Sequence, residues 1–197
     1  MVSGTDYINR DWPGVHTTME NVGEGKGKLM RGREPAPLEE YLTDQLTREG
    51  IEFIKRHKEE PFFLYLAHYA PHTPLQVTDK YYQRFPQFKN ETKRIHAGMI
   101  SALDDGVGAV MDTLEKEGLL ENTLVFFASD NGAPVTIDVD GRPNHPLTGH
   151  KRNLYEGGIR IPFAVQWCGV LPKGKIYEKP ISSLDIFPTA LAAAGVE

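Results

Sequence analysis

The stretch Leu124-Val125-Phe126-Phe127-Ala128-Ser129-Asp130-Asn131-Gly132 passes from an apolar run directly to an acid, an amide and a glycine. The apolar run predicts a buried β-strand, and the glycine allows the backbone to turn sharply after it. α/β proteins present metal or anion sites where such strands end. Because the side-chain oxygens of Asp130 and Asn131 suit a hard cation such as Ca²⁺, this strand end is the first candidate for chemistry.

Helix and strand patterns alternate along the rest of the chain. Apolar residues at helical spacing predict helices, and short apolar runs bounded by glycine or proline predict buried strands. The expected helices are 43–58, 92–117 and 185–194, and the expected strands are 62–67, 124–128 and 161–167. This alternation favours an α/β fold with a mostly parallel sheet sandwiched by helices. Residues 1–41 show neither period and are expected to be an irregular N-terminal segment of the same domain.

The composition excludes several classes of protein. The 197 residues are 40% hydrophobic and 25% charged, as is ordinary for a globular domain. A net charge of -5 leaves no basic face that would hold nucleic acid nonspecifically. No apolar run approaches the roughly 20 residues needed to cross a bilayer, so no membrane partner is expected. The single cysteine, Cys168, excludes an internal disulfide and follows an apolar run, where an inert thiol is more common than a nucleophile.

The polar connection from 129 to 158 is far longer than the roughly 4 to 6 residues typical of compact domains, and loops of that length are usually functional or disordered. Calcium takes about 6 to 8 oxygen ligands, so Asp130 and Asn131 cannot hold it alone. Asp138, Asp140 and Asn144 are nearby candidates for further ligands. On its own, an Asp-Asn-Gly triplet is more often a plain turn.

Two further polar residues are candidates for binding or proton transfer. His72 lies between Pro71 and Thr73-Pro74, and these prolines stiffen the loop that carries the imidazole. A histidine that packs or caps a turn is the alternative. Lys151, in the long connection, is suited to bind a sulfate or phosphate oxygen, although a Lys-Arg pair in a loop is usually solvated surface.

Four motifs taken together resemble the arylsulfatase family. They are YLAHYAPHTP at 65–74, SDNG at 129–132, Lys151 followed by YEGG at 155–158, and SLDIFPT at 183–189. The resemblance covers about Leu42 to Val196. It implies that 42–197 is the middle and later part of a sulfatase catalytic domain of the alkaline phosphatase superfamily. It also implies a sulfuric ester hydrolase that uses a metal to assist hydrolysis.

The resemblance also implies a role for individual residues. Asp130 and Asn131 match the family's second pair of ligands for Ca²⁺, with Mg²⁺ as the alternative ion. His72 matches its sulfate-side histidine, and Lys151 matches its sulfate-binding lysine. The attacking group in the family is formylglycine, made from a Cys or Ser that is followed by x-Pro-x-Arg.

That nucleophile motif is not present in the 197 residues, and neither are the two further metal-binding acids that precede it in the family. Cys168 is followed by Gly169-Val170-Leu171 and does not match. We therefore expect an incomplete and inactive piece, with formylglycine and the remaining metal ligands in an upstream segment.

The implied substrate is a small-molecule or saccharide sulfate ester. The resemblance implies a periplasmic, secreted or lysosomal location if the complete protein follows its family, and the 197 residues do not indicate which. Two other interpretations stay open. The first is a phosphoesterase or phosphonate hydrolase of the same superfamily. The second is a non-catalytic, truncated domain whose exposed sheet edges pair with another copy to form a homo-oligomer.

Overall fold

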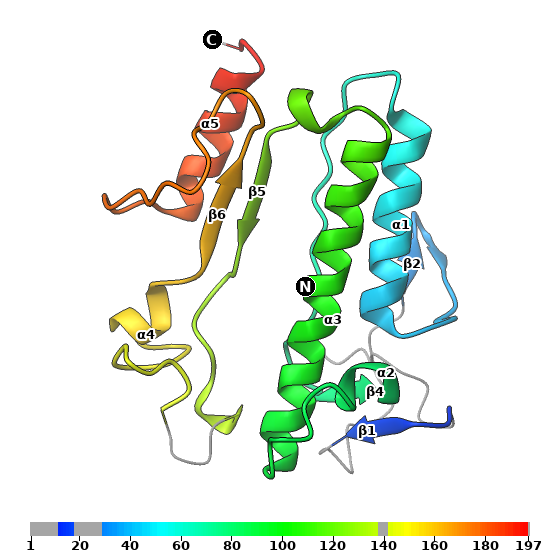
Figure 1. The fold of residues 1–197 in the computed structure, drawn as a ribbon, viewed down its shortest axis with the longest axis vertical. Helices are drawn as coiled ribbons and strands as arrows, with labels where there is room; N and C mark the ends of the chain where they lie inside the picture. Colours follow the sequence, from blue (N-terminus) through cyan, green and yellow to red (C-terminus); the bar gives the residue numbers. More distant parts are fainter. Residues whose placement is uncertain (1–11, 18–28, 138–141, 197) are drawn as a thin grey trace. The chain divides into compact units, whose positions relative to one another are not determined.

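The computed structural model describes residues 12–17, 29–137 and 142–196. The chain divides into two compact units, Met1–Thr113 and Leu114–Glu197, which are called the N-terminal and C-terminal units below and are described separately (Figure 1). The expected ligand candidates Asp138 and Asp140 lie outside the described residues. In the described part of the chain, no helix is long and apolar enough to span a membrane.

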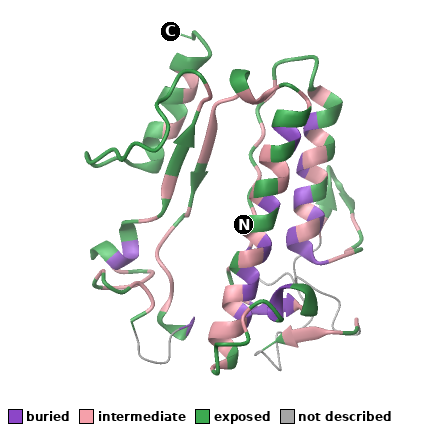
Figure 2. Cartoon of the chain, in the orientation of Figure 1, coloured by how far each residue is buried: buried purple, intermediate pink, exposed green. Residues whose placement is uncertain are grey.

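Two long helices form the core of the N-terminal unit. Helix α1 is Leu42–His57 and α3 is Glu91–Lys116, each within one residue of the predicted ends. The two helices pack closely, because a Cβ on Gly106 of α3 would meet the Thr47 side chain of α1. Figure 2 shows buried residues along both helices. Ile54 on α1 and Met99 on α3 are buried. The predicted apolar stripes are confirmed in part, because Ile54, Ile95, Met99 and Leu114 are buried and the other stripe positions are half-buried.

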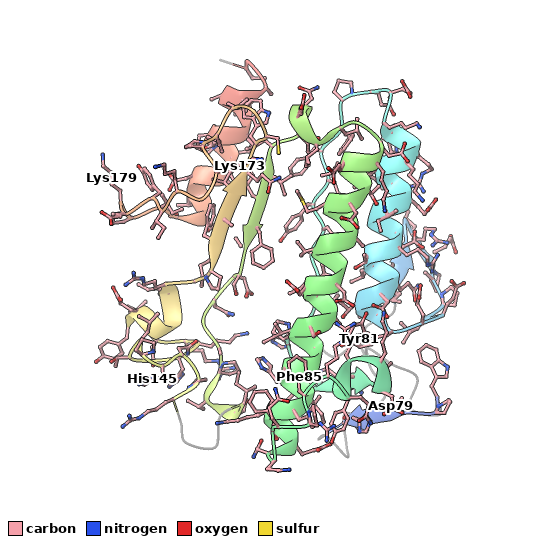
Figure 3. The ribbon with its side chains drawn as sticks, viewed as in Figure 1. Asp79, Tyr81, Phe85, His145, Lys173 and Lys179 are labelled. Carbon is pink, nitrogen blue, oxygen red and sulfur yellow. The ribbon has the colours of Figure 1, made fainter. Side chains whose placement is uncertain are left out.

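Short strands and a third helix complete this unit. Strand β1 (Val15–Thr17) pairs antiparallel with β4 (Gln76–Thr78), and β2 (Met30–Arg31) pairs with β3 (Glu34–Pro35). Helix α2 (Asp79–Tyr82) follows β4 and contributes the fully buried Tyr81 to the core. Figure 3 shows Tyr81 and Phe85 beside α3.

A polar network joins these helices. The Tyr81 hydroxyl donates to Oδ1 of Asp44 over 2.5 Å. Arg84 donates from both terminal nitrogens to the Asp105 carboxylate, each over 2.8 Å. A local structural bond thus accounts for Asp105, and its neighbour Asp104 is exposed. Asp104 and Asp105 therefore do not form a paired-carboxylate site.

Residues 62–67 are not assigned as a strand, so this prediction is wrong for the described structure. Their burial nevertheless alternates as in a strand: Phe63 and Tyr65 are 81% and 80% exposed, while the alternate positions 62, 64 and 66 are half-buried. Leu66 contacts α1 where a Cβ on Gly50 would approach it to 3.1 Å. A strand is defined by hydrogen bonds to a neighbour, and within the described residues no strand pairs with this segment.

The C-terminal unit contains a ribbon of two antiparallel strands, β5 (Val125–Ala128) and β6 (Phe163–Gln166). The strand positions are confirmed, but the predicted parallel sheet is wrong, because every strand pair among the described residues is antiparallel. A parallel pair needs a crossover, usually a helix, whereas the single α-helix described between β5 and β6 is the four-residue α4 (Glu156–Ile159). Both strands are half-buried or exposed rather than buried.

The remaining elements of this unit are short. Helix α5 (Ile186–Ala193) confirms the predicted last helix, and three 3-10 turns are formed by Leu120–Asn122, Val135–Ile137 and Ser183–Asp185. The Trp167 indole donates to the Glu121 carbonyl over 3.1 Å and ties the end of β6 to the first of these turns. Cys168 is half-buried.

Candidate metal and anion site

The turn that follows β5 is held by its own polar side chains. The Ser129 hydroxyl donates to the Asn131 carbonyl over 3.0 Å, and the Ser129 amide donates to the Pro162 carbonyl over 3.1 Å. The Asn131 side-chain nitrogen donates to Oδ1 of Asp130 over 2.8 Å. This bond directs the amide nitrogen toward the carboxylate and leaves the amide oxygen of Asn131 and the second carboxylate oxygen as acceptors.

Those two oxygens fit a hard cation in kind but not in number. Carboxylate and amide oxygens are ligands that Ca²⁺ prefers, yet it takes about 6 to 8 of them. Across the described ranges, no group of three or more His, Cys, Asp or Glu residues is arranged to hold a metal. Asp130 and Asn131 are therefore a partial donor set that needs further ligands.

The Asn144 side chain cross-links the loop between β5 and α4 through hydrogen bonds to its backbone. Its side-chain oxygen accepts from the Ala133 amide over 2.8 Å. Its side-chain nitrogen donates to the Ala133 and Gly149 carbonyls over 3.0 and 3.1 Å. Because its oxygen already has a donor, Asn144 acts as a bridge within the loop, and the expectation that it supplies a metal ligand gains no support.

Lys151 lies in a tight turn beside the Asp130–Asn131 loop. The Lys151 amide donates to the Ala133 carbonyl over 3.1 Å, which joins the two loops directly. The Asn153 amide donates to the His150 carbonyl over 2.9 Å and closes the turn. The His150 ring nitrogen Nδ1 lies 2.7 Å from the Lys151 carbonyl, and since a carbonyl only accepts, Nδ1 carries the proton of that bond.

Glycines allow these loops to approach α4 at van der Waals distance. A Cβ on Gly132 would lie 1.8 Å from the Gly157 carbonyl oxygen, and one on Gly158 would lie 2.2 Å from the Asn153 carbonyl oxygen. The Gly132 amide also donates to the Gly158 carbonyl over 3.0 Å. We call Gly132, Gly157 and Gly158 the glycine junction. It brings the turn after β5, the Lys151 turn and α4 together in the C-terminal unit.

His72 belongs to the N-terminal unit and is described with it. The imidazole is exposed, and its Nδ1 lies 2.7 Å from the Thr73 carbonyl, so Nδ1 carries the proton and Nε2 is the nitrogen that can accept one. The neighbouring Pro74 is buried, which anchors the loop. The structure thus brings the Asp130–Asn131 and Lys151 loops together in the C-terminal unit, and His72 is described within the N-terminal unit.

His68 is a half-buried histidine of the N-terminal unit. Both of its ring nitrogens are buried and lack a hydrogen-bond partner among the described residues. Burial lowers the pKa of this imidazole, which favours the neutral form. Neither the role of Asn144 nor the burial of His68 had a clear signal in the sequence, because both depend on contacts with residues distant along the chain.

Comparison with known proteins identifies the family. The model of the family described as Sulfatase matches residues 4–196. The chain is 38% identical over 172 residues to the uncharacterized sulfatase YdeN of Escherichia coli (strain K12), covering 85% of this chain and 30% of that protein. It is 36% identical over 162 residues to the steryl-sulfatase of Rattus norvegicus, covering 79% of this chain and 27% of that protein. The chain thus spans about a third of the length of these relatives.

A solved structure also resembles the chain in fold. The crystal structure of Ps i-CgsB in complex with k-i-k-neocarrahexaose is 40% identical and superposes with a TM-score of 0.82. The match covers 87% of this chain and 38% of that chain.

Proposed function

Because this chain belongs to the sulfatase family, we propose that it supplies part of the site of a sulfuric ester hydrolase. The observation that carries this proposal is the pair of loops joined by the hydrogen bond from the Lys151 amide to the Ala133 carbonyl. One loop carries two oxygen ligands for a cation, and the other carries a lysine. A cation and an ammonium group in neighbouring loops are suited to bind a sulfuryl group.

The proposed metal ligands in this chain are Asp130 and Asn131. They would hold Ca²⁺, or Mg²⁺ as the alternative, together with ligands from outside the described residues. When bound, the cation would act as a Lewis acid that withdraws charge from the sulfuryl oxygens. Lys151 would hold a further sulfuryl oxygen as a point charge.

His72 is proposed as the group that assists the leaving oxygen. Its Nδ1 proton is engaged by the Thr73 carbonyl, which orients the ring and makes Nε2 the nitrogen that exchanges a proton. A general acid must hold and release a proton, which an imidazole nitrogen can do.

The proposed substrate is a sulfated saccharide. The relative Ps i-CgsB, at 40% identity, is described in complex with a neocarrahexaose. The steryl-sulfatase relative is 36% identical, so the family resemblance alone does not separate a saccharide from another organic sulfate. Oligosaccharide and small aryl sulfates are therefore compared directly in the binding experiment below.

The 197 residues do not include the Cys or Ser from which the family's formylglycine is made. None of the 197 residues begins a Cys or Ser-x-Pro-x-Arg motif, and Cys168 is followed by Gly169-Val170-Leu171. The 197 residues by themselves are expected to bind sulfate without hydrolysing its esters, because positioned charge without a nucleophile does not break the bond.

Calorimetric titration of the purified chain with sulfate, in the presence of Ca²⁺, tests the proposal. Lys151→Met should weaken sulfate binding about tenfold, since a charge-assisted contact is lost. Lys173→Met is the matched control. Lys173 lies on the loop after β6, whereas Lys151 lies on the loop between β5 and α4 that also contains His145, at the other end of the β5–β6 ribbon (Figure 3). No binding of sulfate, or equal loss in both variants, would contradict the proposal.

Parallel titrations with other ligands decide the substrate class. A sulfated oligosaccharide that binds more tightly than an aryl sulfate supports the saccharide assignment, and the reverse order contradicts it. Phosphate binding that exceeds sulfate binding and depends on Lys151 would favour the phosphoesterase alternative. Hydrolysis of an aryl sulfate by the 197 residues would overturn the expectation that they are inactive.

A further inference from the structure

The residue after Lys151 adopts a backbone conformation that its side chain disfavours. Arg152 has a φ of 77° and is the single non-glycine residue with positive φ in the ranges 12–17, 29–137 and 142–196. It occupies the third position of the turn that the Asn153 amide closes on the His150 carbonyl. In a type II turn this position requires positive φ and strongly favours glycine or asparagine.

An arginine at this position gains nothing from the turn itself. The left-handed conformation brings its Cβ close to the following carbonyl oxygen, an arrangement that glycine avoids entirely. The side chain is exposed, and its guanidinium forms no ion pair within the described ranges. Lack of an ion pair does not by itself distinguish Arg152, because the exposed Arg33, Arg56 and Arg142 form none in the described ranges either, whereas Arg160 pairs with Glu156 over 3.0 Å. Arg152 differs from these arginines in its disfavoured backbone conformation next to Lys151, and this combination directs attention to what its guanidinium binds.

The position of Arg152 identifies the chemistry of that ligand. It adjoins Lys151, whose amide is bonded to the Ala133 carbonyl beside the Asp130–Asn131 turn. A guanidinium is a planar fork that matches the oxygens of a sulfate or carboxylate in pairs. We propose that Arg152 is a specificity-determining residue that binds a second anionic group of the substrate, next to the sulfate held by Lys151. The preferred substrate is then a saccharide with at least two anionic groups.

This inference rests on the proposed function, and its test compares two ligands. The probes are a monosulfated and a disulfated disaccharide of the same sugar sequence, titrated into the chain in Ca²⁺. The wild-type chain should bind the disulfated probe about tenfold more tightly. Arg152→Gly should remove that difference and leave the affinity for the monosulfated probe unchanged. The same variant should raise Tm by roughly 2 to 4 °C, because the strained turn position is relieved.

Two further variants make the result specific. Arg152→Asn accepts positive φ, lacks the charge, and replaces the glycine variant if that one folds poorly. Lys173→Gly is the control on a distant loop and should keep the tenfold preference.

Each outcome separates this inference from the proposed function. If the wild-type chain binds neither probe, the proposed function fails, and this inference fails with it. If the wild-type chain and Arg152→Gly prefer the disulfated probe equally, only this inference is overturned. The same holds if the variant weakens both probes by the same factor, because Arg152 would then serve the first sulfate or the fold.

Discussion

Replacing Gly132 with alanine perturbs the glycine junction at its closest contact. The new Cβ would lie 1.8 Å from the Gly157 carbonyl oxygen and 2.8 Å from the carbonyl carbon. Both neighbours are backbone atoms of α4, so no flexible side chain can move aside to make room. The turn after β5 must then separate from α4, and the 3.0 Å hydrogen bond from the Gly132 amide to the Gly158 carbonyl is lost.

The expected loss of stability follows from these two contacts. A lost backbone hydrogen bond lowers the free energy of unfolding by about 1 kcal/mol. Forcing a methyl group into a packed site lowers it by a further ~1 to 3 kcal/mol. The sum, roughly 2 to 4 kcal/mol, is a large part of the 5 to 15 kcal/mol typical of a domain and corresponds to a fall in Tm of about 5 to 15 °C. Because the turn carries Asp130 and Asn131, Ca²⁺ binding should weaken as well.

Urea unfolding and calcium titration of the same samples measure both effects. Gly108→Ala is the matched control, since nothing lies within 4 Å of a Cβ at that exposed position of α3. This control should raise the free energy of unfolding by about 0.5 to 1 kcal/mol, as expected for alanine in a helix interior. A Gly132→Ala chain that unfolds at the wild-type urea concentration and binds Ca²⁺ equally well would refute the junction as described.

Three other perturbations have definite expected results. Asn144→Ala removes three hydrogen bonds and should lower the free energy of unfolding by about 2 to 4 kcal/mol by urea titration, and a change below ~1 kcal/mol would contradict the bridging role. The hydrogen bonds from Arg84 lower the pKa of Asp105, so the stability they supply is present above the ordinary carboxyl pKa and lost as pH falls through the lowered value. Arg84→Met should therefore reduce the fall in the free energy of unfolding at acidic pH, as measured by urea titration at a series of pH values. Burial lowers the pKa of His68, so its contribution is lost as pH falls below about 6.5, and His68→Leu should remove that loss without destabilising the chain at pH 8. An unchanged profile in His68→Leu would show that His68 is not buried in the neutral form.

Local sequence signals located the helices well. The apolar stripe of α3 and the stop at Gly118, whose φ is 72°, set its end to within one residue. Strands β5 and β6 lie within the predicted apolar runs 124–128 and 161–167, although β6 begins two residues later than predicted. These features depend on residues close to one another along the chain, so the sequence contains the information that specifies them.

Strand pairing and loop contacts depend on residues that are distant in sequence, and there the predictions failed or stayed incomplete. The segment 62–67 has the alternating burial of a strand but no strand partner among the described residues, and β5 pairs antiparallel with β6 where a parallel sheet was expected. Asn144 binds Ala133, eleven residues away, which its own neighbours in the sequence do not indicate. The roles of Asp130, Asn131, Lys151 and His72 stay predictions, because they concern ligands rather than contacts within the chain.

The central claim is that the Asp130–Asn131 turn and the Lys151 turn form one site for a cation and a sulfuryl group. Titration of the ¹⁵N-labelled chain with sulfate in Ca²⁺, followed by NMR, tests it most directly. The amide signals of Asn131 and Lys151 should shift together with one dissociation constant, and Lys151→Met should abolish both shifts. Signals that move with different constants, or an Asn131 shift that persists in the variant, would contradict a shared site.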